Sequence, residues 1–335
     1  RVLKDIGITD VTIVPEQEYP NGYFTTCSYP NPEIFAALEL GLNLAKETGA
    51  DLMLATDPDA DRVGIAMKCP DGSYELVSGN EVGVLLLDYI AAGRIEKGTM
   101  PEKPVAVKSL VSTPLADAVA EHYGVELRSV LTGFKWIGDQ IAQLEEAGEV
   151  DRFIFGFEES YGYLAGPYVR DKDAVSACSL LAEICAWAKD QGKTLYDVVM
   201  DIYLEYGFSK EFTINVVKPG KSGADEIKQM MTDFRNNPPK ELGGSKVVTW
   251  KDYQTLEQRD ANGNVSKLEM PETSNVLQWF CEDGTKISVR PSGTEPKIKF
   301  YIEVKGTMKC NGCYDRCTSE ANNKIAEIKK SLNLN

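Results

Sequence analysis

Three aspartates occupy alternate positions in residues 56–62 (TDPDADR), directly after an apolar stretch, DLMLA. Carboxylates at i, i+2 and i+4 of a loop can converge on one hard cation such as Mg²⁺. Without a cation or strong donors, repulsion among the three charges would be costly. Because ligands often bind at the carboxyl end of a buried strand, we predict that Asp57, Asp59 and Asp61 bind Mg²⁺. The neighbouring Arg62 would suit a phosphate oxygen bound to the same ion.

Other interpretations of this aspartate loop exist. An EF-hand is disfavoured, because position six is Arg62 instead of glycine and position twelve is Lys68 instead of glutamate. An aspartyl-phosphate phosphatase would use Asp57 as the nucleophile and Asp59 as the acid, but Asp61 stands where such enzymes usually keep threonine or valine. The remaining alternative is a solvated acidic turn.

A second candidate site lies in residues 156–162 (GFEESYG), again after an apolar stretch. Carboxylate and hydroxyl groups at the end of a strand can bind sugar hydroxyls, and the flanking glycines let the backbone approach a ligand closely. Glu158 and Ser160 are therefore candidate substrate-binding residues. The alternative is a helix N-terminus with acidic residues in its first turn.

A third candidate site lies in residues 290–297 (RPSGTEPK). This stretch combines a guanidinium group, two hydroxyls, a glycine whose N–H can be exposed and a lysine, which together can hold a phosphate. A simple hairpin turn is the alternative, and by itself the more common one. The candidate phosphate-binding residues are Arg290, Ser292, Gly293, Thr294 and Lys297.

Two weaker motifs complete the set. In residues 170–173 (RDKD), Lys172 could exchange a proton with a sugar hydroxyl if its pKa were tuned, although such charge alternation is usually a solvated loop. Residues 132–136 (TGFKW) by themselves indicate the start of a helix with aromatic core contacts.

The elements around these motifs predict an α/β protein. We expect a strand at residues 11–14, a helix beginning at Asn31–Pro32, and a hairpin of residues 63–67 and 73–77 around an Asp-Gly turn. Further on, strands alternate with helices as far as residue 207, which implies mostly parallel sheets flanked by helices. The last part shows several strands and one polar helix at residues 320–332, typical of an α+β domain. The expected domains are residues 1–93, 94–207 and 208–335.

Composition narrows the function. The chain has 335 residues, 43% of them hydrophobic, and a formal net charge of −15, which argues against binding to nucleic acid or an anionic membrane. No apolar run reaches the length of a membrane span, and no signal peptide is visible. The expected location is the cytoplasm, and the expected partners, which the motifs and not the composition indicate, are small-molecule sugar phosphates.

The eight cysteines are too sparse for a disulfide scaffold and favour a reduced setting, so we expect free thiols. The last three, Cys310, Cys313 and Cys317, have the spacing C-x2-C-x3-C. A zinc or iron–sulfur site is the alternative for these three, although no fourth ligand is evident nearby.

The order of the motifs, first an aspartate loop, then a sugar loop and then a phosphate loop, resembles the α-D-phosphohexomutase family over essentially the whole chain. It looks closest to the phosphoglucomutase/phosphomannomutase branch, in which TGFKW, FEES and RPSGTEPK forms occur. The resemblance implies the later part of domain II, then domain III and the C-terminal domain. The implied activity is an isomerase that moves a phosphoryl group between positions 1 and 6 of a sugar, most closely that of glucose.

By this resemblance Asp57, Asp59 and Asp61 hold one Mg²⁺, and Arg62 helps to hold the phosphate of a phosphoserine. Glucose 1,6-bisphosphate would be the activator and intermediate. Lys172 resembles a lysine proposed as general acid/base. The implied substrate-binding residues are Glu158, Ser160, Lys135, Arg170, Arg290, Ser292, Gly293, Thr294 and Lys297.

One departure from the family pattern is large. The phosphoserine lies in a motif such as T-A-S-H-N-P in domain I, and no such motif occurs in these 335 residues. We therefore expect a fragment without the catalytic-serine domain and without mutase activity of its own. The alternatives are the aspartyl-phosphate phosphatase and a non-catalytic module that binds sugar phosphates.

Overall fold

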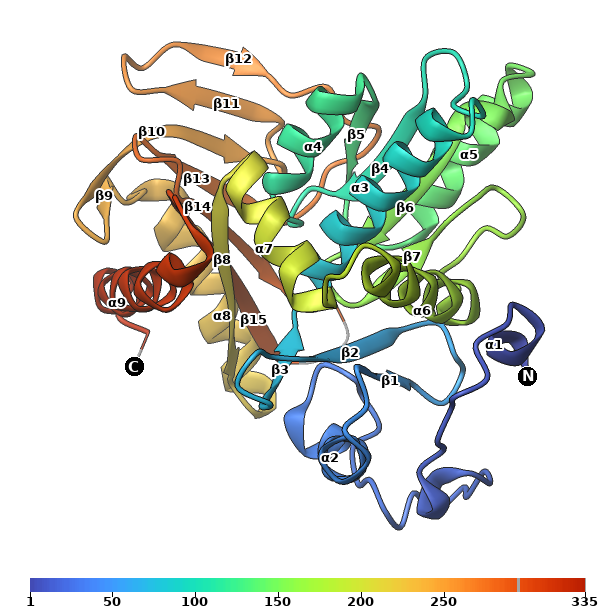
Figure 1. Ribbon diagram of the computed structural model, residues 1–335. Helices are drawn as coiled ribbons and strands as arrows, with labels where there is room; N and C mark the ends of the chain where they lie inside the picture. The colour runs from blue at the N-terminus through green and yellow to red at the C-terminus, as the bar shows by residue number, and fades with distance from the viewer. Residues whose placement is uncertain (294–295, 335) are drawn as a thin grey trace. The chain divides into compact units, whose positions relative to one another are not determined.

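The computed structural model describes residues 1–293 and 296–334 (Figure 1). The chain folds into two compact units, Arg1–Ile202 and Tyr203–Asn335, and the division falls within helix α7 (Leu195–Tyr206). Each unit has its own sheets and its own buried apolar residues.

The first sheet of the first unit has the order β1–β2–β3 and is antiparallel throughout. Its strands are joined by residues 57–62 and 69–73, which are too short for the crossover that parallel strands need. The predicted hairpin is confirmed by the β2–β3 pairing. The strands are β1 (Leu52–Thr56), β2 (Val63–Lys68) and β3 (Tyr74–Val77).

Helix α2 (Phe35–Thr48) covers this sheet. Its buried residues recur at helical spacing and pack against two side chains of the strands. They are Leu38, Leu42 and Ala45 on the helix, with Met53 on β1 and Ala66 on β2. This small core fixes the end of β1, from which the aspartate loop leaves.

Two predictions near the N-terminus are wrong. Helix α2 does not begin at Asn31–Pro32, because Asn31 Oδ1 accepts the backbone N–H of Glu33 at 2.9 Å and forms a turn before the helix starts at Phe35. Residues 11–14 do not form a strand, and they pair with no other strand of the described chain. Their apolar side chains are largely exposed, so β-branched residues alone did not suffice.

The second sheet has the order β5–β4–β6–β7 and confirms the predicted parallel pairing, with β4 parallel to both β5 and β6. Neighbouring residues of β6 face opposite sides. A Cβ at Gly156 would meet Ile137 of α5, whereas Phe157 lies against Gly83 of α3, so helices cover both faces (Figure 1). The elements are α3 (Gly79–Glu96), β4 (Val105–Ser109), α4 (Leu115–Tyr123), β5 (Glu126–Val130), α5 (Lys135–Glu146), β6 (Phe153–Glu158), β7 (Gly162–Leu164) and α6 (Ala174–Asp190).

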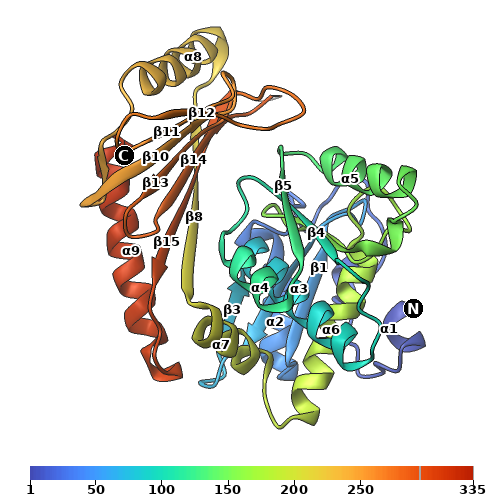
Figure 2. The ribbon, with the colours of Figure 1, turned by 90° about the horizontal axis from the view of Figure 1, so that it is seen from above.

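The second unit is built on an antiparallel sheet of order β12–β11–β10–β13–β14–β15–β8, with β9 paired to β10. Helices α8 and α9 pack against this sheet (Figure 2), which confirms the α+β prediction, although α8 was not predicted. The elements are β8 (Phe208–Val217), α8 (Gly220–Asn236), β9 (Glu241–Leu242), β10 (Ser245–Asp252), β11 (Glu257–Asp260), β12 (Val265–Lys267), β13 (Leu277–Cys281), β14 (Lys286–Pro291), β15 (Lys297–Gly306) and α9 (Tyr314–Ser331).

The remaining elements are short: the helix α1 (Val2–Asp5) and the 3-10 turns η1 (Pro15–Gln17), η2 (Val150–Arg152) and η3 (Asn311–Cys313). Within residues 1–293 and 296–334, none of the helices has the length and apolar character needed to cross a membrane.

Candidate active site

The loop between β1 and β2 gathers the three predicted metal ligands. One carboxylate oxygen each of Asp57, Asp59 and Asp61 can be chosen so that all lie within 4.8 Å of one another. The chain reverses at Ala60, whose φ of 56° lies in the left-handed region that non-glycine residues rarely adopt. The turn is closed by Asp57 Oδ1, which accepts the backbone N–H groups of Asp61 at 3.1 Å and Arg62 at 3.0 Å.

The electrostatics of this aspartate loop favour a cation. Burial, together with the nearby Asp61 and Asp59, raises the pKa of Asp57 to about 6, against the opposing hydrogen bond from the Arg62 backbone. In addition, Asp61 Oδ1 is buried and accepts no hydrogen bond from any residue that the structure describes. A buried acceptor without a donor is costly. The oxygen donors and their crowding therefore fit a hard cation such as Mg²⁺.

Two basic side chains border the aspartates. Lys172 Nζ lies 2.8 Å from Asp61 Oδ2 and 2.8 Å from Asp171 Oδ1. Burial alone would lower the pKa of Lys172, but its hydrogen bonds to these carboxylates outweigh burial and raise the pKa. Lys172 is therefore protonated at neutral pH, and these contacts hold its proton more tightly than in an ordinary lysine. Arg62 Nε lies 3.7 Å from Asp61 Oδ1.

The aspartate loop is joined directly to residues 156–162, the predicted sugar loop. The Val63 N–H donates to the Tyr161 carbonyl at 3.1 Å, and Arg62 forms an isolated bridge with Gly162. Gly162 also explains how Lys172 reaches Asp61, because a Cβ at Gly162 would lie 2.2 Å from Lys172 Cδ. Two motifs that lie about 100 residues apart in the sequence thus form one region within the first unit.

The sugar loop itself is held in a fixed conformation. Glu158 is 9% exposed, and its Oε1 accepts the Gly133 N–H at 2.7 Å. Gly133 has a φ of 114°, so the TGFKW motif contributes a backbone donor that a larger residue would not easily supply. Tyr161, with a φ of 67°, is a second left-handed non-glycine residue. Ser160, partly exposed, lies between these constrained positions.

Several residues that support this region were not predicted as site residues from the sequence. Glu159 Oε2 accepts hydrogen bonds from Ser109 Oγ at 2.8 Å and from Ser112 Oγ at 3.4 Å, which ties the loop to the end of β4. Gly79 lets the N-terminus of α3 approach the same loop, because a Cβ there would lie 2.1 Å from the Glu159 carbonyl oxygen. No local sequence signal identifies these contacts. Glu33, 3.6 Å from Arg62 Nη1, was likewise not predicted.

Lys135 and Arg170 are the remaining candidate substrate-binding residues of the first unit. Lys135 is exposed at the start of α5, with its Nζ 4.5 Å from the centre of the Trp136 ring. The predicted helix start with aromatic contacts is confirmed there, since the N-cap residue Phe134 is buried. Arg170 forms an ion pair with Glu145 at 2.7 Å, so α5 engages its guanidinium group.

The candidate phosphate residues lie in the second unit, where β14 turns into β15. The Ser292 N–H donates to the Lys297 carbonyl at 2.8 Å and closes the hairpin, while Gly293 is exposed. Arg290 projects from β14, and no hydrogen bond or ion pair joins its guanidinium to another described residue. This cation is thus available to an anion. Thr294 lies outside the described residues.

Comparison with known families agrees with these motifs. Three domain models of phosphoglucomutase/phosphomannomutase match: α/β/α domain II at residues 1–72, α/β/α domain III at residues 78–206 and the C-terminal domain at residues 241–312. The chain therefore belongs to the phosphoglucomutase/phosphomannomutase family, which confirms the resemblance to the α-D-phosphohexomutases.

Individual curated proteins and solved structures of this family are also similar to the chain. The phosphoglucomutase of Staphylococcus aureus (strain MRSA252) is 39% identical over 306 residues, which are 91% of this chain and 54% of that protein. The chain thus spans about half the length of this curated relative. Among solved structures, pp63/parafusin from Paramecium, a phosphoglucomutase in its open form, has a TM-score of 0.61 at 20% identity, over 91% of this chain and 50% of that one.

A phosphoglucomutase/phosphomannomutase family protein from Burkholderia thailandensis has a TM-score of 0.53 at 16% identity, over 90% of this chain and 51% of that one. At these identities, the two solved structures support the fold alone.

Proposed function

We propose that this chain supplies the metal, sugar and phosphate sites of a phosphohexomutase that interconverts sugar 1-phosphates and sugar 6-phosphates, with glucose phosphates as its substrates. The observation that carries the proposal is the direct connection of the aspartate loop to the sugar loop, with Lys172 across both. In this proposal residues 1–93 carry the metal site, residues 94–207 the sugar site and residues 208–335 the phosphate site.

Asp57, Asp59 and Asp61 would hold one Mg²⁺, which when bound would stabilise negative charge on the phosphoryl group in transfer. Arg62 would hold an oxygen of that phosphoryl group. The Arg62 Nε atom lies 3.7 Å from Asp61 Oδ1 and 3.9 Å from Asp57 Oδ2, and both distances are longer than a hydrogen bond. The guanidinium group can therefore form shorter and stronger contacts with an anion.

Lys172 would act as the general acid, because it lies between Asp61 of the aspartate loop and Gly162 of the sugar loop. Glu158 and Ser160 would bind two sugar hydroxyls. Both oxygens of a carboxylate accept hydrogen bonds, which suits Glu158 to a sugar hydroxyl. The remaining candidates are assigned to the sugar phosphate: Lys135, Arg170, Arg290, Ser292, Gly293, Thr294 and Lys297.

We further propose that the nucleophile is a phosphoserine outside this sequence, since no T-A-S-H-N-P-type motif occurs in the 335 residues. The chain alone would then bind substrate and metal but would not turn substrate over. Glucose 1,6-bisphosphate would be the intermediate and activator, and the cytoplasm the location of the reaction.

The test is an assay of the 335-residue chain beside the product of its whole open reading frame. Both receive glucose 1-phosphate, Mg²⁺ and a trace of glucose 1,6-bisphosphate, and glucose 6-phosphate is measured. We expect turnover only by the longer protein, and its loss in Asp59→Asn. The matched control Glu47→Gln removes an exposed charge outside the site and should retain activity.

Turnover by the 335-residue chain itself would overturn the proposed place of the nucleophile. If the longer protein is inactive with glucose 1-phosphate, mannose and pentose 1-phosphates test the substrate. Inactivity with all three, together with reduction of a phosphorylated Asp57 to homoserine by borohydride, would favour the phosphatase instead.

A further inference from the structure

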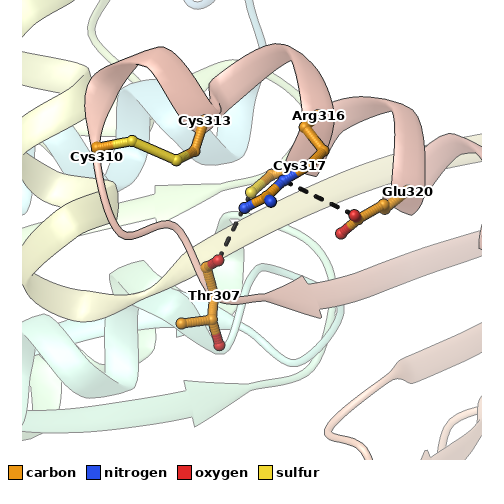
Figure 3. The surroundings of a disulfide bond; sticks show 6 residues. All are labelled: Thr307, Cys310, Cys313, Arg316, Cys317 and Glu320. Carbon is orange, nitrogen blue, oxygen red and sulfur yellow. Dashed lines mark hydrogen bonds and ion pairs between the residues drawn. A yellow bond between two sulfur atoms is a disulfide. The ribbon is translucent and has the colours of Figure 1, made fainter.

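Cys310 and Cys313 form a disulfide in the second unit, between β15 and α9 (Figure 3). The expectation of free thiols is wrong for this pair, while the other six cysteines of the described chain are free. The two Cα atoms lie 5.4 Å apart, within the usual range of about 4.4–6.8 Å for disulfides. Two cysteines three positions apart reach this distance through the turn η3, so the bond requires no distant part of the chain.

The disulfide is open to solvent on one side. Cys310 is exposed, Asn311 and Gly312 between the cysteines are exposed, and Cys313 is half-buried. Cys317, one helical turn further on, is 4% exposed, and its thiol donates to the Thr307 carbonyl at 3.6 Å. A thiol from solution can therefore reach the sulfur of Cys310 and is kept from that of Cys317.

Opening the bond would leave α9 in place. The helix begins at Tyr314, after the disulfide, and four further buried residues fix it to the sheet: Cys317, Ala321, Ile325 and Ile328. Cys313 is the N-cap residue of this 18-residue helix. A thiolate at that position is stabilised by the unpaired backbone N–H groups of the first turn, which makes Cys313 the better leaving group.

We propose that Cys310 and Cys313 are a reversible dithiol–disulfide site that exchanges with low-molecular-weight thiols of the glutathione class. A thiolate RS⁻ attacks the sulfur of Cys310, the Cys310–Cys313 bond breaks, and Cys313 leaves as a thiolate. A second RS⁻ then attacks the R-bearing sulfur of the mixed disulfide and releases RSSR and the Cys310 thiolate. The protein disulfide gains two electrons and two thiols are oxidised, so the exchange balances.

A metal site is the competing interpretation of the three cysteines. It requires the thiolate of Cys317 to turn toward the other two, but this thiol is buried and donates to Thr307. Within the described residues, the one group of side chains placed to hold a metal is Asp57, Asp59 and Asp61. The geometry therefore favours a two-cysteine exchange site with Cys317 as a packing residue.

The test equilibrates the 335-residue chain, purified without reductant, in mixtures of glutathione and glutathione disulfide. Thiols are then blocked with N-ethylmaleimide and mapped by peptide mass spectrometry. We expect Cys310 and Cys313 to become labelled together in a single transition, while circular dichroism keeps its helical signal. Burial raises the pKa of Cys178 to about 12 and that of Cys281 to about 11, so these thiols should label slowly.

Variants separate the roles of the three cysteines. Because Cys310 is exposed, Cys310→Ser should fold and leave Cys313 able to form one mixed disulfide with glutathione. The matched control Cys317→Ser should keep the transition, with its exchange equilibrium constant changed by less than about threefold. Labelling of both Cys310 and Cys313 in the most oxidising mixture would overturn the proposal. So would a disulfide that includes Cys317.

A last arm adds one equivalent of Zn²⁺ to the fully reduced chain. We expect Cys310 and Cys313 to remain open to N-ethylmaleimide and the zinc to be lost on gel filtration. Zinc retained with protection of Cys310, Cys313 and Cys317 would replace the exchange site by a metal site. This readout is independent of mutase activity, so it stands whether or not the proposed function is correct.

Discussion

The ammonium group of Lys172 contacts Asp61 Oδ2 at 2.8 Å, and the same carboxylate supplies an oxygen to the aspartate cluster. A cation held by the three aspartates would therefore share Asp61 with Lys172. Two positive charges on one carboxylate repel each other, and partial burial of Lys172 weakens solvent screening between them. The proposed general acid and the proposed metal are thus coupled through Asp61.

This coupling predicts that Lys172→Met strengthens Mg²⁺ binding. Loss of one neighbouring positive charge should lower the Mg²⁺ dissociation constant of the 335-residue chain about three- to tenfold, or roughly 0.6–1.4 kcal/mol. Isothermal titration with MgCl₂ measures the change. Lys135→Met is the control, because Lys135 is exposed on Trp136 and the charge change is identical. An unchanged or weaker affinity in Lys172→Met would contradict the coupling.

Gly162→Ala should produce the same effect without removing a charge. The new Cβ would lie 2.2 Å from Lys172 Cδ and 2.7 Å from Lys172 Cγ, so the flexible lysine stem must move away from Asp61. We expect tighter Mg²⁺ binding in the same titration. The double variant Gly162→Ala with Lys172→Met should bind no more tightly than Lys172→Met, since both changes remove one contact. Full additivity would show that Gly162 acts through another route.

The sequence was sufficient to predict features that depend on residues close together in the chain. The aspartate loop, the hairpin of β2 and β3 and the TGFKW helix start depend on residues close in the chain, and the structure has all of them. The helix predicted at Asn31–Pro32 failed because the Asn31 side chain satisfied a turn donor instead, a choice that sequence patterns do not resolve. Residues 11–14 failed because a strand also needs a neighbouring strand.

Contacts between residues that are distant in the chain could not be predicted from the sequence. Glu159 meets Ser109 only because β4 and β6 run parallel, so that both strands end at the same edge of the sheet. The hydrophobic pattern of the two strands does not reveal how they pair with each other. The C-x2-C-x3-C spacing similarly fits free thiols, a metal or a disulfide, and only the turn at Asn311–Cys313 distinguishes the pair from Cys317.

Two identical substitutions on helix α3 should have opposite effects. Gly79→Ala places a Cβ 2.1 Å from the Glu159 carbonyl oxygen and 2.9 Å from the Tyr161 nitrogen, both backbone atoms that cannot turn aside. We expect a loss of about 1–3 kcal/mol from overpacking. Gly93→Ala meets nothing within 4 Å and should gain about 0.5–1 kcal/mol from helix propensity. Hydrogen exchange of α3 amides measures both, and a loss in Gly93→Ala would contradict this reasoning.

The last prediction concerns Ser109 and Glu159, the contact that anchors the sugar loop to β4. Ser109 is fully buried, and its hydroxyl donates to a charged acceptor, so removing the charge by Glu159→Gln should cost about 1–2 kcal/mol. Ser109→Ala should cost a similar amount. If the two residues act through this one bond, the double variant should cost less than the sum, with a coupling of about 1 kcal/mol.

Hydrogen exchange of the β4 and β6 amides measures this cycle locally, so unfolding of the second unit does not enter the result. Because Ser112 lies 2.9 Å from Ser109 and also reaches Glu159, Ser112→Ala is the matched control. Its bond to Glu159 is longer, at 3.4 Å, so its coupling to Glu159 should be the smaller of the two. Equal couplings would mean that the two serines hold the loop as one unit, and zero coupling for Ser109 would show that Glu159 does not anchor the loop at all.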